Sequence, residues 1–152
     1  MMTEVVVRGV RRDDLPAVVE LLIGGSLTPE VESLDRLDDY WMAVLDVRAK
    51  DGEVFVADAG GEVVGVCQVV VFRNIGHHGQ RVAEVENVHV RVDRRSSGIG
   101  GELLATCETW ARDANCHRIQ LTSNMTRTDA HRFYERLGFR ATHKGFKKQL
   151  RG

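Results

Sequence analysis

The residues from 95 to 100 have the composition and spacing of a loop that binds a phosphate group. Arg95, Gly98 and Gly100 form an Arg-x-x-Gly-x-Gly pattern after a β-rich apolar run, and an amphipathic helix follows at once. The first N–H groups of a helix have no partner within it, so they can point at an anion. We therefore predict a phosphate cradle made mostly of backbone, from Arg95, Ser96, Ser97, Gly98, Ile99 and Gly100. The Arg95 side chain could instead brace the turn.

Two commoner phosphate loops do not fit this segment. A dinucleotide-binding loop needs a third glycine where Leu103 stands, and it needs an acid about 20 residues further on. The next predicted strand ends there in a Thr-Ser-Asn run. A P-loop ends in Gly-Lys-Ser/Thr, whereas Gly100 is followed by a glycine and a glutamate. From these residues alone, a turn with a purely structural role stays open.

Two acids lie on the strand that leads into the loop. Glu84 and Glu86 are two residues apart in a strand predicted over 82–92, so they share one face of the sheet. A primary amine has a pKa near ~10 and is mostly protonated at neutral pH, so an enzyme that uses it as a nucleophile needs a base. Glu86 and Glu84 are the candidates. Exposed or ion-paired carboxylates without a catalytic role are the alternative.

The hydrophobic pattern places these residues in one mixed α/β domain over 1–152. Helices are predicted at 13–25, 33–50, 98–115 and 129–137. Strands are predicted at 4–10, 54–59, 63–72, 82–92 and 118–122, with one or two more within 140–150.

Composition and charge argue against several other classes of protein. The chain has 152 residues, 43% of them hydrophobic, and its net charge of −1 indicates no nucleic-acid partner. No apolar run reaches the ~20 residues that span a bilayer, and no signal peptide is recognised. Three cysteines without metal or redox spacing predict reduced thiols in a cytoplasmic protein. The six histidines are scattered, so no metal site is predicted.

The glycine-containing loop and a second segment together resemble the Gcn5-related N-acetyltransferase (GNAT) family. Residues 95–100 are similar to the family's motif A, which holds the pyrophosphate of acetyl-CoA. Residues 130–139, Ala-His-Arg-Phe-Tyr-Glu-Arg-Leu-Gly-Phe, are similar to the segment that follows motif A in these enzymes. The resemblance covers essentially the whole chain. It implies the GNAT fold, with a central, mostly antiparallel twisted sheet of six to seven strands and about four flanking helices.

The resemblance also implies a reaction and roles for several residues. Acetyl-CoA, as cosubstrate, would pass its acetyl group directly to a primary amine in a ternary complex. Glu86 occupies the position at which several small-amine members of the family carry an acidic residue on the central strand. Tyr134 occupies the position of the family's general acid, which protonates the leaving thiolate. The cofactor contacts implied beyond the loop involve Val88, His89, Val90, Asn124 and Arg127.

A narrower resemblance concerns the acceptor. Residues 122–134 and 142–150 and the His77-His78 loop are similar to aminoalkylphosphonate N-acetyltransferases. This implies a small-molecule amine, similar to an aminoalkylphosphonate, as the acceptor. The net charge and the hydropathy of the chain predict no nucleic-acid or membrane partner. Relatives are often dimers, so a homodimer is an option. Two alternatives stay open: acetylation of a protein N-terminus or lysine, and a catalytically idle domain that binds CoA as a sensor.

Overall fold

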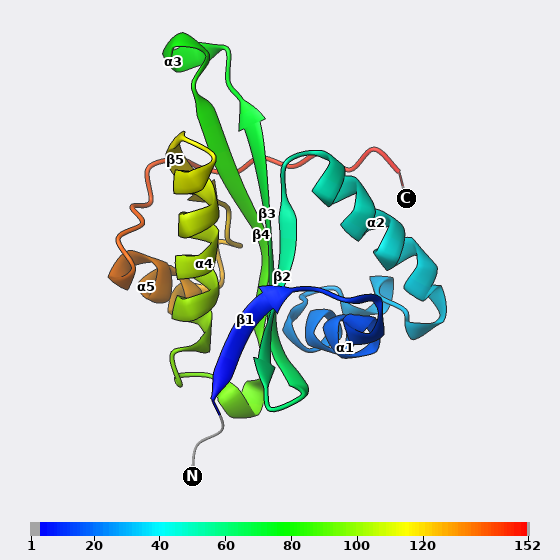
Figure 1. Ribbon diagram of the computed structural model, residues 1–152. Coiled ribbons are helices and arrows are strands. Elements are labelled where there is room, and N and C mark those ends of the chain that lie inside the picture. Colours follow the sequence, from blue (N-terminus) through cyan, green and yellow to red (C-terminus); the bar gives the residue numbers. More distant parts are fainter. Residues whose placement is uncertain (1–3, 152) are drawn as a thin grey trace.

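The computed structural model describes residues 4–151, which form a mixed sheet with helices on both faces (Figure 1). Its strands are β1 (Val5–Gly9), β2 (Glu53–Ala59), β3 (Glu62–Arg73), β4 (Arg81–Val90) and β5 (Cys116–Leu121). They lie in chain order, and each neighbouring pair is antiparallel except β4 and β5, which are parallel. The predicted mixed α/β class and the mostly antiparallel sheet are confirmed.

The helices divide between the two faces of the sheet (Figure 1). One face carries α1 and α2, and the other carries α4 and α5. The helices are α1 (Leu15–Gly25), α2 (Leu37–Ala49), the single turn α3 (Gly76–Gly79), α4 (Ile99–Asp113) and α5 (Thr128–Arg136). Short 3-10 turns precede α1 and α2, and another follows β4. As a result, the α-helix predicted at 33–50 begins only at Leu37, and the strand predicted at 82–92 ends at Val90.

The prediction of one or two strands within 140–150 is wrong, and the sheet has five strands rather than six to seven. A strand forms only where its backbone can pair with a neighbour. Among the described residues, the last backbone hydrogen bond runs from Phe139 to the carbonyl of Tyr134. The segment beyond it passes across the sheet near Thr122 rather than along an edge (Figure 1). Its apolar side chains stay in solvent, with Phe146 90% and Leu150 88% exposed.

Two hydrophobic cores lie on opposite faces of the sheet. Because side chains alternate along a strand, Phe55 and Ala57 of β2 join the core under α4, whereas Val54 and Val56 join the core under α1 and α2. Strands β2 and β3 are buried on both faces, so their sequences are nearly continuous apolar runs. The sheet therefore forms the rigid middle layer from which the residues of β4 project.

Strand β4 contains a β-bulge that reorients its second half. Glu86 is opposite Gln68 of β3, but His89 is opposite Val66, so two residues of β4 oppose Cys67 alone. Asn87, the first residue of the bulge, has a left-handed backbone with φ of 55°. Val66 and Gln68 are two residues apart and share a face, so Glu86 and His89 also share that face, although they are three residues apart.

Gly65 marks the closest approach of α4 to the sheet. A Cβ atom at this position would lie 3.0 Å from Leu103 Cδ1, 3.1 Å from Ile99 Cγ2 and 3.3 Å from Ala57 Cβ. We expect Gly65→Ala to lower the free energy of unfolding by about 1–3 kcal/mol, because an added methyl group overpacks this contact. Urea denaturation measures the change.

Gly101, inside α4, provides the matched control. A Cβ atom there would meet only Leu137 Cδ2, at 4.0 Å. Since alanine favours a helix more than glycine does, Gly101→Ala should raise the free energy of unfolding by about 0.5–1 kcal/mol. Equal stability of the two variants would contradict the tight packing of α4 on β3.

Candidate active site

Strands β4 and β5 diverge and leave part of β4 unpaired on that side. Their pairing ends at Val85 and Leu121, while β4 continues to Val90. Glu86, His89 and Val90 pair with β3 on one side, and the other backbone edge of residues 86–90 has no partner on β5. Such an edge can hydrogen-bond an extended ligand as an added strand would. The side chains of Val88 and Val90 pack against the core under α4, so these residues offer a ligand mainly their backbone.

The predicted phosphate loop follows directly after β4 and leads into α4. Ser96 and Gly98 have left-handed backbones, with φ of 64° and 89°. A Cβ atom on Gly98 would have no other atom within 4 Å, so open space faces it. The first helical hydrogen bond joins Glu102 N to the Gly98 carbonyl, which leaves the N–H groups of residues 99–101 without helical partners. The loop therefore has the free donors that an anion requires.

Two side chains hold this loop in shape. The Arg95 Nε donates to the carbonyl of Val90 over 3.2 Å, and the Ser97 hydroxyl donates to the carbonyl of Arg94. Arg95 thus braces the turn against the end of β4, which was one of its two predicted roles. A cavity of about 450 Å³ lies beside this end of the strand, and Gly24, Val90 and Arg95 are among the residues that line it.

Gly100 faces a neighbouring helix, not the open space in front of the loop. A Cβ atom on Gly100 would lie 2.9 Å from Phe133 Cζ. The absence of a side chain therefore lets α5 pack on the first turn of α4. The sequence pattern alone offered no way to distinguish this packing role from contact with a phosphate.

Tyr134 lies one residue further along α5, with its ring 5.2 Å from that of Phe133 and 5.9 Å from that of Phe139. It packs against the core under α4, to which Cys67 belongs, and Cys67 is opposite the bulge of β4. Burial raises the pKa of the Tyr134 hydroxyl above its ordinary value, and the nearby Arg127 partly opposes this. No hydrogen bond engages this hydroxyl within residues 4–151. Tyr134 is therefore a protonated phenol with a free donor.

The two glutamates of β4 have different surroundings. Glu84 accepts a 2.7 Å hydrogen bond from Nε2 of Gln120, which lies directly opposite on β5. Glu86 stands just beyond the paired region and is exposed. Burial of its carboxylate and the charge of Glu84 raise the pKa of Glu86, while Lys147 of the C-terminal segment lowers it. Glu86 is thus the carboxylate available to a ligand. Gln120 and Lys147 carried no signal in the sequence that marked them as its surroundings.

Arg127 and Asn124 make hydrogen bonds within the protein. The Arg127 guanidinium donates to the carbonyl of Gly25, the last residue of α1. The Asn124 side chain closes its own turn by accepting from the N–H and the hydroxyl of Thr126. His131 contacts the backbone of the same turn through its Nε2, 2.8 Å from the Asn124 carbonyl. The Arg127 bond joins the start of α5 to the end of α1, and the other contacts hold the turn before α5 in shape.

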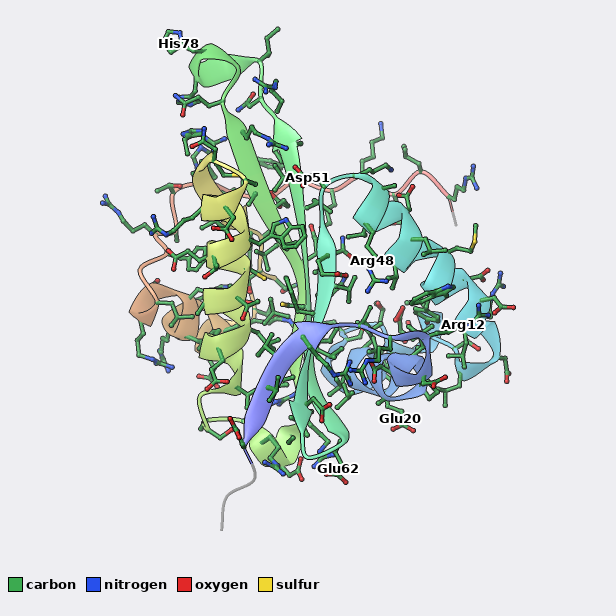
Figure 2. The ribbon with its side chains drawn as sticks, in the orientation of Figure 1. Arg12, Glu20, Arg48, Asp51, Glu62 and His78 are labelled. Carbon is green, nitrogen blue, oxygen red and sulfur yellow. The ribbon has the colours of Figure 1, made fainter. Side chains whose placement is uncertain are left out.

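We call the place where β4 continues beyond its pairing with β5 the opening. The histidines of the β3–β4 hairpin lie away from it. The ring centroids of His77 and His117 are 4.9 Å apart, and His78 lies at the tip of the hairpin (Figure 2). Across residues 4–151, no three histidine, cysteine or acidic side chains are grouped so that they could hold a metal ion. In the same part of the chain, every helix is too short or too polar to cross a bilayer.

Comparisons with known proteins agree with this geometry. The family model "Acetyltransferase (GNAT) family" matches residues 16–139. The aminoalkylphosphonate N-acetyltransferase of Salmonella typhimurium is 38% identical over 90 residues, which cover 59% of this chain and 58% of that protein, less than two thirds of its length. The aminoglycoside N(6')-acetyltransferase type 1 of Stenotrophomonas maltophilia is 30% identical over 132 residues, or 85% of this chain and 82% of the relative.

Solved structures share the whole fold. A transcriptional regulator from Bacillus halodurans C-125 superposes with a TM-score of 0.90 at 33% identity, over 97% of this chain and 100% of that one. AAC(6')-Iy, solved with a CoA-containing bisubstrate analogue, superposes with a TM-score of 0.80 at 18% identity, over 99% and 100% of the two chains. The chain belongs to the GNAT family of acetyltransferases.

Proposed function

We propose that this enzyme acetylates the primary amine of a small molecule by direct attack of the amine on acetyl-CoA. One observation carries the proposal: the unpaired edge of β4 lies between a free phenol and a free carboxylate. Tyr134 approaches from the α4 side, and Glu86 projects on the α1 side. Acetyl transfer to an amine needs both an acid for the leaving thiolate and a carboxylate or base for the ammonium.

In this proposal, acetyl-CoA binds along β4 and its diphosphate lies at the start of α4. Backbone N–H groups of residues 95–100 would hold the diphosphate, since those after Gly98 have no helical partner. The pantetheine amides would pair with the free edge at Val88, His89 and Val90. Asn124 and Arg127 were also predicted as cofactor contacts. In this proposal they would contact acetyl-CoA through the side-chain N–H groups that are not used in hydrogen bonds within the protein.

The chemistry follows from these positions. A backbone N–H near Val88 would stabilise the negative charge that develops on the acetyl oxygen. Glu86, on the same face as Glu84, would hold the incoming ammonium, which must lose a proton to a base before its nitrogen attacks the thioester. The thiolate of CoA, whose conjugate acid has a pKa near ~8.5, would take a proton from Tyr134 as it leaves.

We propose an aminoalkylphosphonate-like molecule as the acceptor. The 38% identity to the Salmonella typhimurium enzyme supports this choice. The charges around the opening also fit a molecule with an ammonium at one end and an anion at the other, because Glu86 lies near the basic Lys147. We further propose a cytoplasmic enzyme, supported by the free thiols of its cysteines, and a homodimer, supported by the exposed apolar side chains of Phe146 and Leu150.

A thiol-release assay over a panel of amines, with calorimetry of CoA binding, tests the function. We expect CoA to bind and to be released from acetyl-CoA when aminoethylphosphonate is supplied. Turnover only with aminoglycosides or glucosamine 6-phosphate would keep a small-molecule acceptor but change its class. Turnover only with peptides would favour protein acetylation, and binding without turnover on any amine would favour a CoA sensor.

Gly98→Ala tests the phosphate cradle. The added methyl group would stand in the open space before the loop, so we expect the affinity for acetyl-CoA to fall about tenfold, or about 1.4 kcal/mol. Gly61→Ala in the β2–β3 turn is the matched control, because Gly61 also has a positive φ, of 98°, and no atom within 4 Å of its Cβ position. Similar CoA affinities in the two variants, measured by calorimetry, would contradict the cradle.

Tyr134→Phe tests the acid. We expect kcat to fall about 10²-fold, since the thiolate then leaves without a proton donor, while the affinity for acetyl-CoA is kept. Tyr40 is the other tyrosine of the chain, and its hydroxyl accepts a 3.0 Å hydrogen bond from the Ser33 backbone. Tyr40→Phe should lower stability by about 1 kcal/mol and leave kcat unchanged. Unchanged turnover in Tyr134→Phe would remove this residue from the mechanism.

A further inference from the structure

The imidazole of His89 is a half-buried titratable group, beside the opening between β4 and β5, that the mechanism above does not use. The bulge of β4 places His89 opposite Val66, two residues along β3 from the partner of Glu86. His89 and Glu86 are therefore neighbours on the face that α1 and α2 cover. The sequence implies His89 only as a cofactor contact, because the face of the sheet that His89 occupies depends on the bulge.

The ring of His89 packs against the backbone at the end of α1. A Cβ atom on Gly25 would lie 2.1 Å from its Nδ1, 2.8 Å from its Cε1 and 3.0 Å from its Cγ. Only glycine permits this approach, and it leaves Nε2 as the ring nitrogen directed away from Gly25. The carbonyl of Gly25 also accepts the hydrogen bond from Arg127. His89 thus stands where α1, β4 and the start of α5 meet.

The groups around His89 favour a neutral ring. Arg127 acts on it from the turn before α5 and Arg95 from the loop after β4. Glu86 is its neighbour on the same face of β4, and the backbone of Gly25 packs against it from α1. Burial of the ring, and then the charges of Arg127 and Arg95, lower the pKa of His89 below its ordinary value. No hydrogen bond engages its side chain within residues 4–151. The ring is therefore a neutral proton acceptor at pH 7.

The position of His89 suits proton transfer better than those of the glutamates. Glu84 is held by Gln120, and Glu86, charged and exposed, is suited to hold an ammonium. Arg127 perturbs the pKa of both His89 and Tyr134, and it is not among the groups that perturb Glu86. Arg127 donates to the carbonyl of Gly25, the residue against which His89 packs, so it is a neighbour of both groups that exchange protons.

We propose that His89 accepts the proton that the acceptor ammonium loses, while Glu86 holds that ammonium in place. This inference rests on the proposed acetyl transfer. An N–H bond breaks and its proton passes to Nε2 of His89; the freed lone pair forms the N–C bond at the thioester carbonyl. The C–S bond then breaks with its electron pair on sulfur, which takes the proton of Tyr134. The second ammonium proton restores Tyr134, and His89 releases its proton to solvent.

His89→Gln and Glu86→Gln distinguish the two roles by steady-state kinetics. We expect His89→Gln to lower kcat about 10²-fold with the KM for acetyl-CoA unchanged, and Glu86→Gln mainly to raise the KM for the amine. In the wild type, kcat/KM should fall in acid, at a pH below the ordinary histidine pKa, because His89, whose pKa is lowered by burial, becomes protonated there. In His89→Gln this fall of kcat/KM at low pH, the acid limb of the profile, should be absent. His78→Gln, at the hairpin tip (Figure 2), is the matched control and should behave as the wild type.

Circular dichroism and calorimetry with CoA show whether each variant is folded and binds the cosubstrate. If His89→Gln does not fold, His89→Asn replaces it, and the acid limb of the wild-type profile remains as an independent measurement. A wild type active on an amine, with either His89 variant equal to it in kcat and pH profile, would overturn this inference and leave the proposed function standing. A wild type inert on every amine would overturn both.

Discussion

The divergence of β4 from β5 is the constraint on which the rest of this site depends. Up to Val85 the two strands pair in parallel, and beyond it β4 continues alone on that side. The bulge opposite Cys67 begins just past this point. A bulge bends a strand and increases its local twist, so it helps to carry β4 away from β5. The free backbone edge and the reorientation of His89 both follow from this irregularity.

Close contacts at three glycines hold the surrounding helices in fixed positions around that edge. Gly65 brings α4 onto β3, Gly100 brings α5 onto α4, and Gly25 brings the end of α1 onto β4. Each contact is closer than a Cβ atom would allow without movement. Because protein interiors are densely packed, such contacts leave helices little freedom to slide. They hold Tyr134 on one side of the opening and the His89 ring on the other.

The electrostatics of the site follow from the same arrangement. Glu86 lies just outside the paired part of the sheet, where water reaches it, and it shares its face with Glu84. Two carboxylates on one face repel each other and attract a cation. Tyr134 and His89 are both more buried and lie near Arg127, and burial favours the neutral form of each. A charged group that binds and two neutral groups that exchange protons thus stand around one opening.

Local patterns determined much of this protein. Hydrophobic periodicity located the four long helices and the five strands, because burial on one face of a helix or on both faces of a strand sets the order of apolar residues. The single turn α3 was predicted as a loop. The loop from Arg95 to Gly100 and the segment around Tyr134 identified the family. The tertiary structure alone decided that residues 140–150 form no strand, since pairing needs a neighbouring edge, and that Gly100 serves packing. It alone brought Gly25, His89 and Arg127 together, because a bulge and contacts between residues distant in the chain leave no periodic signal in the sequence.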